Sequence, residues 1–159
     1  MIEIGQEAPD FTLYDSEKKQ VSLSSFRGQP VLLLFFPLAF TSTCTKELCQ
    51  VRDDLAWYNN VNAKVFGISV DSLHTLAKYK AEQQLNFTLL SDFNKEVSKA
   101  YNSLYEKFGY GMQGVTKRSA FVIDENGITR YSEILENASE IPDFGAIQKV
   151  LEATHLKFS

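Results

Sequence analysis

The sequence has few of the residues that bind metal ions. It contains only two cysteines, Cys44 and Cys49, and two histidines, His74 and His155, which are remote from the cysteines along the chain. The spacing C-x4-C differs from the C-x2-C pairs of zinc sites, and a tetrahedral zinc ion needs more ligands than this chain supplies. Cysteines five residues apart in one expected helix also suit no structural disulfide. We therefore expect free thiols in a reducing compartment, with no metal and no cofactor.

Long apolar runs and clusters of positive charge are also missing. The longest apolar run, 31–36, is far shorter than the roughly 20 residues that cross a bilayer. The acidic start of the chain, 1–7, does not resemble a secretory signal. The formal net charge is −4, and no group of lysines and arginines is available to neutralise phosphates. These features predict a cytoplasmic protein that binds neither membranes nor nucleic acid.

What the sequence does contain is an alternation of strand and helix signals in one domain, 1–159. Apolar runs predict strands at 31–36, 64–70 and 88–90. Residues spaced three and four apart predict helices at about 44–59, 73–84, 95–104 and 144–156. The runs 118–123 and 128–135 predict a tight hairpin in which Asn126-Gly127 supplies the positive φ angles. We expect an α/β, thioredoxin-like fold: a mixed central sheet flanked by helices, with an N-terminal extension.

Cys44 is placed where a thiolate would be stabilised. Three hydroxyl residues, Thr41, Ser42 and Thr43, precede the helix 44–59 and can cap its free amides. The amides and the positive end of the helix dipole favour an anion. An ordinary thiol has a pKa near 8.5 and is only about 3% ionised at pH 7, so such a site raises its reactivity. The alternative is a buried, unreactive cysteine that packs as a small apolar residue.

The residues before Cys44 resemble the peroxiredoxin signature, because Pro37, Thr41 and Cys44 follow the pattern P-x3-T-x2-C. Other segments resemble the family in the same order along essentially the whole chain: Ala8–Phe11, Leu23–Gly28, Gly67–Asp71, Leu90–Asp92 and Lys117–Asp124. The resemblance implies a thiol-dependent peroxidase in which Cys44 attacks the peroxide. Thr41 would hydrogen-bond to the thiolate and the peroxide, and Pro37 would shield the sulfur.

The resemblance also implies roles for three further residues. The backbone amides of Thr43 and Cys44 would complete the cradle for the peroxide, and Arg118 would stabilise the thiolate and the transition state. Without the resemblance, Arg118 would be assigned to the solvated surface. Glu47 suits equally a solvent-facing acid in the first helical turn and a residue that orients the arginine.

The role of Cys49 has two interpretations. The segment 41–49 resembles the alkyl hydroperoxide reductase E type, whereas Cys49 itself resembles the resolving cysteine of the bacterioferritin-comigratory type. In an intact helix the Cα atoms of Cys44 and Cys49 would lie more than about 8 Å apart, beyond the disulfide limit of about 7 Å. Resolution by Cys49 therefore requires the helix to unwind. The alternative is a one-cysteine enzyme that is resolved by an external thiol.

Two other functional classes fit the same fold. A thiol–disulfide oxidoreductase of the thioredoxin type would use C-x-x-C, but position 47 is Glu here. A non-enzymatic redox sensor is the second alternative. For the peroxidase, the resemblance implies a hydroperoxide substrate and a thioredoxin-like or other thiol reductant. It also implies a homodimer, for which the segment 105–112 offers an adaptable surface.

Overall fold

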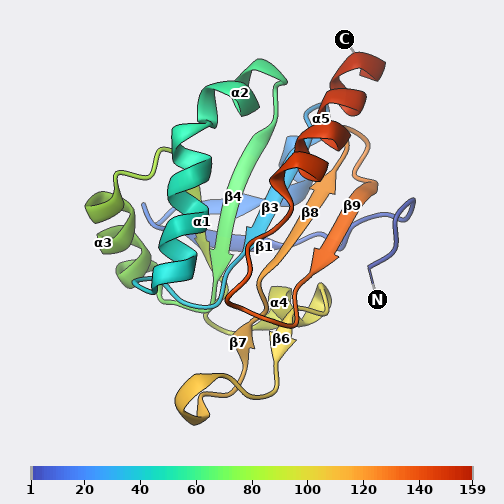
Figure 1. Cartoon of the computed structure of the whole chain (residues 1–159). Helices are drawn as coiled ribbons and strands as arrows, with labels where there is room; N and C mark the ends of the chain where they lie inside the picture. Colours follow the sequence, from blue (N-terminus) through green and yellow to red (C-terminus); the bar gives the residue numbers. More distant parts are fainter. Residues whose placement is uncertain (1, 159) are drawn as a thin grey trace.

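A computed structural model describes residues 2–158, and at its centre is a seven-stranded sheet in the order β2-β1-β5-β4-β3-β8-β9 (Figure 1). β3 pairs in parallel with β4, and β4 with β5, whereas the other neighbours in this sheet are antiparallel. β6 and β7 form a separate pair. The strands are β1 (Thr12–Asp15), β2 (Gln20–Ser22), β3 (Val31–Phe35), β4 (Lys64–Ser69), β5 (Thr88–Ser91), β6 (Leu104–Tyr105), β7 (Val115–Thr116), β8 (Ser119–Ile123) and β9 (Thr129–Ile134).

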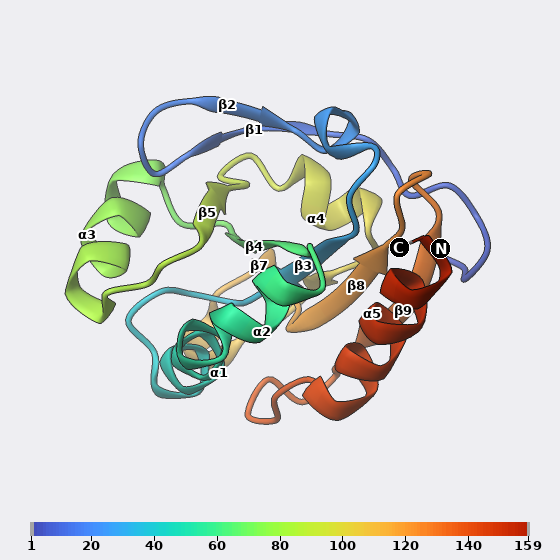
Figure 2. The same cartoon turned by 90° about the horizontal axis from the view of Figure 1, so that it is seen from above.

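Helices cover both faces of the sheet (Figure 2). α1, α2, α3 and α5 contribute to the core on one face, and α4 packs on the other face with the N-terminal segment. The helices are α1 (Ser42–Asp53), α2 (Leu55–Asn60), α3 (Leu73–Gln83), α4 (Glu96–Ala100) and α5 (Phe144–Phe158), with 3-10 turns η1 (Leu23–Phe26) and η2 (Gly109–Gly111). The expected mixed sheet flanked by helices is confirmed, and the N-terminal extension is the hairpin of β1 and β2.

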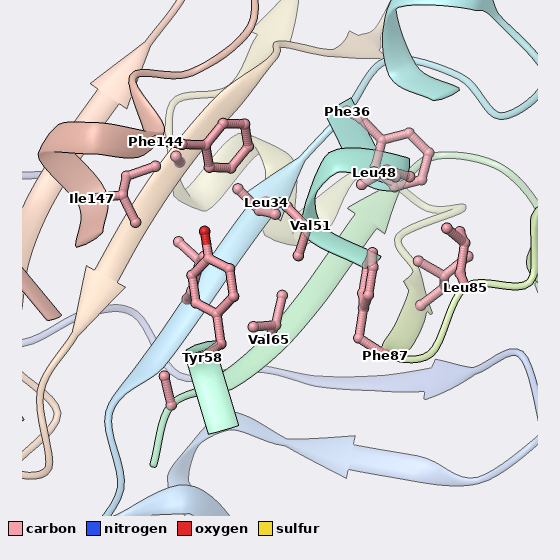
Figure 3. Close-up of a cluster of buried hydrophobic side chains, with 14 of the residues drawn as sticks. Leu34, Phe36, Leu48, Val51, Tyr58, Val65, Leu85, Phe87, Phe144 and Ile147 are labelled. Carbon is pink, nitrogen blue, oxygen red and sulfur yellow. The ribbon is translucent and has the colours of Figure 1, made fainter. Parts of the chain in front are cut away.

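β3 is central because it supplies both cores. All five of its side chains are at most 2% exposed. Successive strand residues point to opposite faces, so Leu32 and Leu34 join the core beneath α1, while Leu33 and Phe35 join the core beneath α4. Figure 3 shows the first of these cores, in which Leu34 lies among side chains from α1, α2 and α5. This packing fixes the end of β3, from which the chain passes to α1.

Two expected helices have different limits in the structure. The helix expected at 44–59 is divided at Asp54, which separates α1 from α2. Adjacent acids, Asp53 and Asp54, lie at the carbonyl end of α1, where the helix dipole disfavours negative charge. The helix expected at 95–104 ends at Ala100, because Asn102 adopts a left-handed φ of 54° and the amide of Ser103 bonds to the carbonyl of Ser98.

The expected tight turn at Asn126-Gly127 is wrong in detail. Gly127 has a positive φ of 84°, but Asn126 does not. The Gly127 amide donates to the Asp124 carbonyl, and the side chain of Asp124 accepts from the amides of Asn126 and Ile128. The carboxylate therefore shapes a longer loop between β8 and β9, accompanied by a register shift at Val122/Ile123. Within residues 2–158, no helix is long and apolar enough to cross a membrane.

Candidate active site

The loop from β3 to α1 is anchored to the end of β4. The carboxylate of Asp71 accepts hydrogen bonds from the Ala39 amide at 2.8 Å and from the Ser69 hydroxyl at 2.7 Å. Pro37 is buried at the start of this loop. As a result, α1 begins beside the carboxyl ends of β3 and β4 (Figure 1).

Cys44 lies in the first turn of α1. The first intrahelical bond runs from the Thr45 amide to the Thr41 carbonyl, so the amides of Thr43 and Cys44 precede the helical bonding pattern. Capping by hydroxyl side chains, as expected from the sequence, is wrong. Thr41 is the N-cap residue, but its hydroxyl donates to the Leu38 carbonyl at 2.8 Å, and Ser42 and Thr43 lie inside the helix. The first amides of α1 thus remain available to an anion near Cys44.

Arg118 connects Cys44 to two other groups. Its Nη2 donates to the sulfur of Cys44 at 3.1 Å, its Nη1 donates to Glu47 Oε1 at 2.6 Å, and its Nε donates to the Ala138 carbonyl at 2.9 Å. Cys44 is 1% exposed, Glu47 0% and Arg118 2%. The surface assignment of Arg118 and the solvent-facing alternative for Glu47 are therefore wrong. The structure brings together three of the residues singled out in the sequence.

Burial and charge act in opposite directions on this ion pair. Burial raises the pKa of Glu47 to about 7, although the nearby positive charge and hydrogen bond of Arg118 act to lower it. For Arg118, burial acts to lower the pKa, but attraction to Glu47 and Cys44 outweighs it and the pKa rises. Among residues 2–158, no donor lies within hydrogen-bonding distance of Glu47 Oε2. The arginine is therefore a firmly held cation that can share its charge with the cysteine sulfur.

Cys49 lies on a different side of α1 from Cys44. Its half-buried thiol donates to Gln83 Oε1 of α3 at 3.7 Å, and both cysteines are free. Five residues of helix correspond to a rotation of about 140° and a Cα separation of roughly 8.7 Å. The structure therefore does not bring the two sulfur atoms together while α1 is intact.

Two groups that shape the site were missed in the sequence. Asp71 stands directly before Ser72 at the start of α3, where both residue types are typical helix caps, but only Ser72 caps that helix, by accepting from the Thr75 amide. A carboxylate directly after a buried strand, next to the loop that carries a reactive cysteine, was the available signal. The Ala138 carbonyl has no signal in the sequence, because every residue has a backbone carbonyl and the residue type does not show which one accepts a hydrogen bond.

Comparison with known proteins identifies the family of this chain. Residues 4–132 match the model of the AhpC/TSA family. The chain belongs to this family. It is similar to alkyl hydroperoxide reductase E of Mycobacterium tuberculosis, with 39% identity over 146 residues, which cover 90% of this chain and 92% of that protein. It is also similar to the chloroplastic peroxiredoxin Q of Oryza sativa subsp. japonica, with 38% identity over 127 residues, 80% of this chain and 57% of that protein.

Solved structures of peroxiredoxins have the same fold. Peroxidoxin BcpB from Mycobacterium tuberculosis superposes with a TM-score of 0.85 at 28% identity, covering 96% of this chain and 98% of that one. Peroxiredoxin Q from Xanthomonas campestris gives a TM-score of 0.82 at 25% identity and covers 98% of each chain. The comparisons confirm the assignment of this chain to the peroxiredoxins, between the alkyl hydroperoxide reductase E type and the bacterioferritin-comigratory type. The protein is a thiol-dependent peroxidase that acts on a hydroperoxide with a thiol reductant.

The buried Glu47 predicts a pH-dependent contribution to stability. Its folded pKa of about 7 exceeds the ordinary value of 4.5, so the folded protein binds more protons than the unfolded chain between these values. The free energy of unfolding that Glu47 contributes is therefore fully present below pH 4.5 and falls, by at most roughly 3 kcal/mol, as the pH rises to about 7. Glu47→Gln should abolish this fall, as measured by urea unfolding at a series of pH values.

Both proteins in this comparison should carry Cys44→Ser, which prevents oxidation of the thiol during the measurement. Glu136→Gln serves as the control for loss of one negative charge, because Glu136 is an exposed carboxylate paired with Lys117. If the unfolding free energies of Cys44→Ser and of the Cys44→Ser, Glu47→Gln double variant differ by a constant amount across this pH range, the raised pKa of Glu47 is contradicted.

Proposed function

We propose that Cys44 is the peroxidatic nucleophile of this peroxiredoxin, and that Cys49 resolves its sulfenic acid as an intramolecular disulfide. The observation that carries the proposal is the 3.1 Å contact between Arg118 Nη2 and the sulfur of Cys44, in a buried site at the start of α1. A guanidinium and free helix amides stabilise negative charge both on sulfur and on the departing oxygen. No step of the proposed cycle needs a cofactor.

In the first step, the Cys44 thiolate attacks the terminal oxygen of the hydroperoxide. A sulfur–oxygen bond forms, the O–O bond breaks, and the alkoxide or hydroxide that leaves takes a proton from solvent. Arg118 and the amides of Thr43 and Cys44 stabilise the charge that develops on the leaving oxygen. Glu47 holds the guanidinium in place through Nη1, so that Nη2 is directed at the sulfur.

Thr41 receives a narrower role than the sequence suggested. A hydroxyl has one proton, and that of Thr41 is donated to the Leu38 carbonyl. Its oxygen can then only accept, so in the proposed complex it accepts the O–H of the peroxide instead of donating to the thiolate. Pro37, buried in the same loop, shields the sulfur from bulk water.

In the second step, the Cys49 thiol attacks the Cys44 sulfenic acid. A disulfide forms, the sulfur–oxygen bond breaks, and the oxygen leaves as water. Because the Cα separation in an intact helix exceeds the disulfide limit, the first turns of α1 must open for this step. A dithiol protein of the thioredoxin type then reduces the disulfide to two thiols. The alternative is a one-cysteine cycle in which an external thiol replaces Cys49.

The proposal also includes the location, domain organisation and oligomeric state of the enzyme. We place the enzyme in the cytoplasm as a single domain of 159 residues that forms a homodimer. The segment 105–112 supports a dimer contact, because Tyr110 is fully exposed and Met112 is 37% exposed. Binding to membranes or nucleic acid is not part of the proposed function.

Removing the guanidinium tests the proposed site. Arg118→Ala should slow the reaction of Cys44 with hydrogen peroxide by roughly 10²- to 10³-fold, the usual effect of losing one donor to a transition state. Stopped-flow measurement with the reduced enzyme in excess isolates this first step from recycling.

Arg130→Ala is the matched control, because it removes the same charge from a side chain that is 39% exposed and paired with Asp124. It should react within about twofold of the wild type. Arg118→Lys keeps the buried charge but not the three-way fork, so a large loss in this variant separates geometry from folding. An unchanged rate in both Arg118 variants would remove the residue from the mechanism.

Cys49→Ser tests the resolving step. The variant should reduce the first equivalent of peroxide at the normal rate, stall as the Cys44 sulfenic acid, and form sulfinic acid at lower peroxide doses than the wild type. Mass spectrometry of the wild type after one equivalent should find a Cys44–Cys49 disulfide, since closing so short a loop costs little entropy. If the wild type forms no internal disulfide and the variant recycles normally, the enzyme uses one cysteine.

A further inference from the structure

We infer that Tyr79 of α3 is a positioning residue for the resolving step, because it holds the first turns of α1 closed and so limits how fast Cys49 reaches oxidised Cys44. The inference rests on the proposed resolving role of Cys49. It adds a residue outside the site described above, which touches neither the peroxide nor the reacting sulfur atoms.

The contact that carries the inference joins Tyr79 to Thr45, the residue after Cys44. The two hydroxyl oxygens are 2.9 Å apart, and Tyr79 is 0% exposed. Burial raises the pKa of Tyr79 to about 12, so the phenol keeps its proton and the pair its hydrogen bond at neutral pH. When the first turn of α1 unwinds, Thr45 moves away and this partly buried hydrogen bond must break.

Tyr79 also contacts the chain on the other side of Cys44. The ring of Phe40 packs edge-on against that of Tyr79 at a centroid distance of 5.0 Å. Phe40 has a φ of 64°, a left-handed conformation that is strained for a bulky side chain. Tyr79 therefore contacts the residue after Cys44 and the loop before it, and both contacts hold this part of the chain against α3.

Cys49 lies on the same side of α1 as Thr45. Thr45, Cys49 and Arg52 are spaced four and three residues apart, and all of them contact α3, at Tyr79 or Gln83. Cys44 faces Arg118 instead. Thr45 lies between the two cysteines in the chain, so the unwinding that brings Cys44 to Cys49 moves Thr45 and breaks its contact with Tyr79.

The test is Tyr79→Phe, which deletes one hydroxyl and keeps the ring that packs on Phe40. Two quantities follow from the inference: amide hydrogen exchange of the segment 41–53 in the reduced protein, and the rate of disulfide formation after one equivalent of hydrogen peroxide. Both should rise about fivefold, the effect of losing one hydrogen bond of average strength. The peroxide dose that overoxidises half of Cys44 should rise by a similar factor, because sulfenic acid is consumed sooner. The rate of the first step should stay within about twofold of the wild type.

Tyr101→Phe is the matched control. Tyr101 is also 0% exposed, and its hydroxyl donates to the Pro9 carbonyl in the core on the other face of the sheet. It should lower global stability without changing exchange in 41–53. Thr45→Val removes the other partner of the pair, so it should act like Tyr79→Phe, and the double variant should add nothing further.

The outcomes separate this inference from the proposed function. Faster exchange in 41–53 together with faster disulfide formation supports the inference. Unchanged exchange in Tyr79→Phe overturns it, even if the wild type forms the Cys44–Cys49 disulfide. Faster exchange with an unchanged disulfide rate also overturns it, because opening would then not limit resolution. If no internal disulfide forms in wild type or variant, the resolving role of Cys49 and this inference both fail.

Discussion

The guanidinium of Arg118 joins parts of the chain that are far apart in the sequence. It bonds to Cys44 and Glu47 of α1 and to the Ala138 carbonyl beyond β9, while its own residue immediately precedes β8. Breaking a buried ion pair by removing one partner typically costs about 3–5 kcal/mol, so this contact also ties α1 to the sheet. The position of the Cys44 sulfur and the stability of the helix start therefore depend on the same side chain.

In the proposed cycle, this arrangement favours attack on the peroxide at the expense of disulfide formation. An intact first turn supplies the amides and the fixed position that stabilise charge during attack on the peroxide. The same turn keeps Cys44 and Cys49 on different sides of α1, each bonded to a different part of the protein. An enzyme that uses both cysteines must therefore alternate between a closed and an open α1. In such an enzyme, the free-energy difference between these states decides whether sulfenic acid is resolved or oxidised further.

The local features of this fold could be predicted from the sequence because they have local causes. β3 is a continuous apolar run, and α3 begins at an N-cap serine, as its sequence indicates. The division at Asp54 was missed, since the apolar spacing continues through it into α2. Hydroxyl residues before Cys44 were correctly associated with a helix start, but whether Thr41 caps the helix or bonds to Leu38 depends on the conformation of the loop.

The tertiary part of the site could be anticipated only through the family resemblance. Neither spacing nor periodicity relates Arg118 to Glu47, which are 71 residues apart and meet because β8 pairs with β3 and β3 leads into α1. The contact of Tyr79 with Thr45 could not be predicted from the sequence for the same reason, because it depends on how α3 packs beside α1. The role of Asp71 could not be predicted either, because an aspartate beside a helix start commonly caps the helix, whereas here it accepts from the Ala39 amide in the loop before α1.

The most direct test of the central claim compares the reduced wild type with Cys44→Ser in the presence of one equivalent of hydrogen peroxide. Peroxide consumption and the oxidation state of each cysteine would be followed over time. The account predicts that the wild type consumes the peroxide rapidly with oxidation beginning at Cys44, whereas the variant leaves it unconsumed, because a serine hydroxyl is not ionised near neutral pH. Rapid consumption by Cys44→Ser, with oxidation at Cys49, would contradict the assignment of Cys44 as the nucleophile.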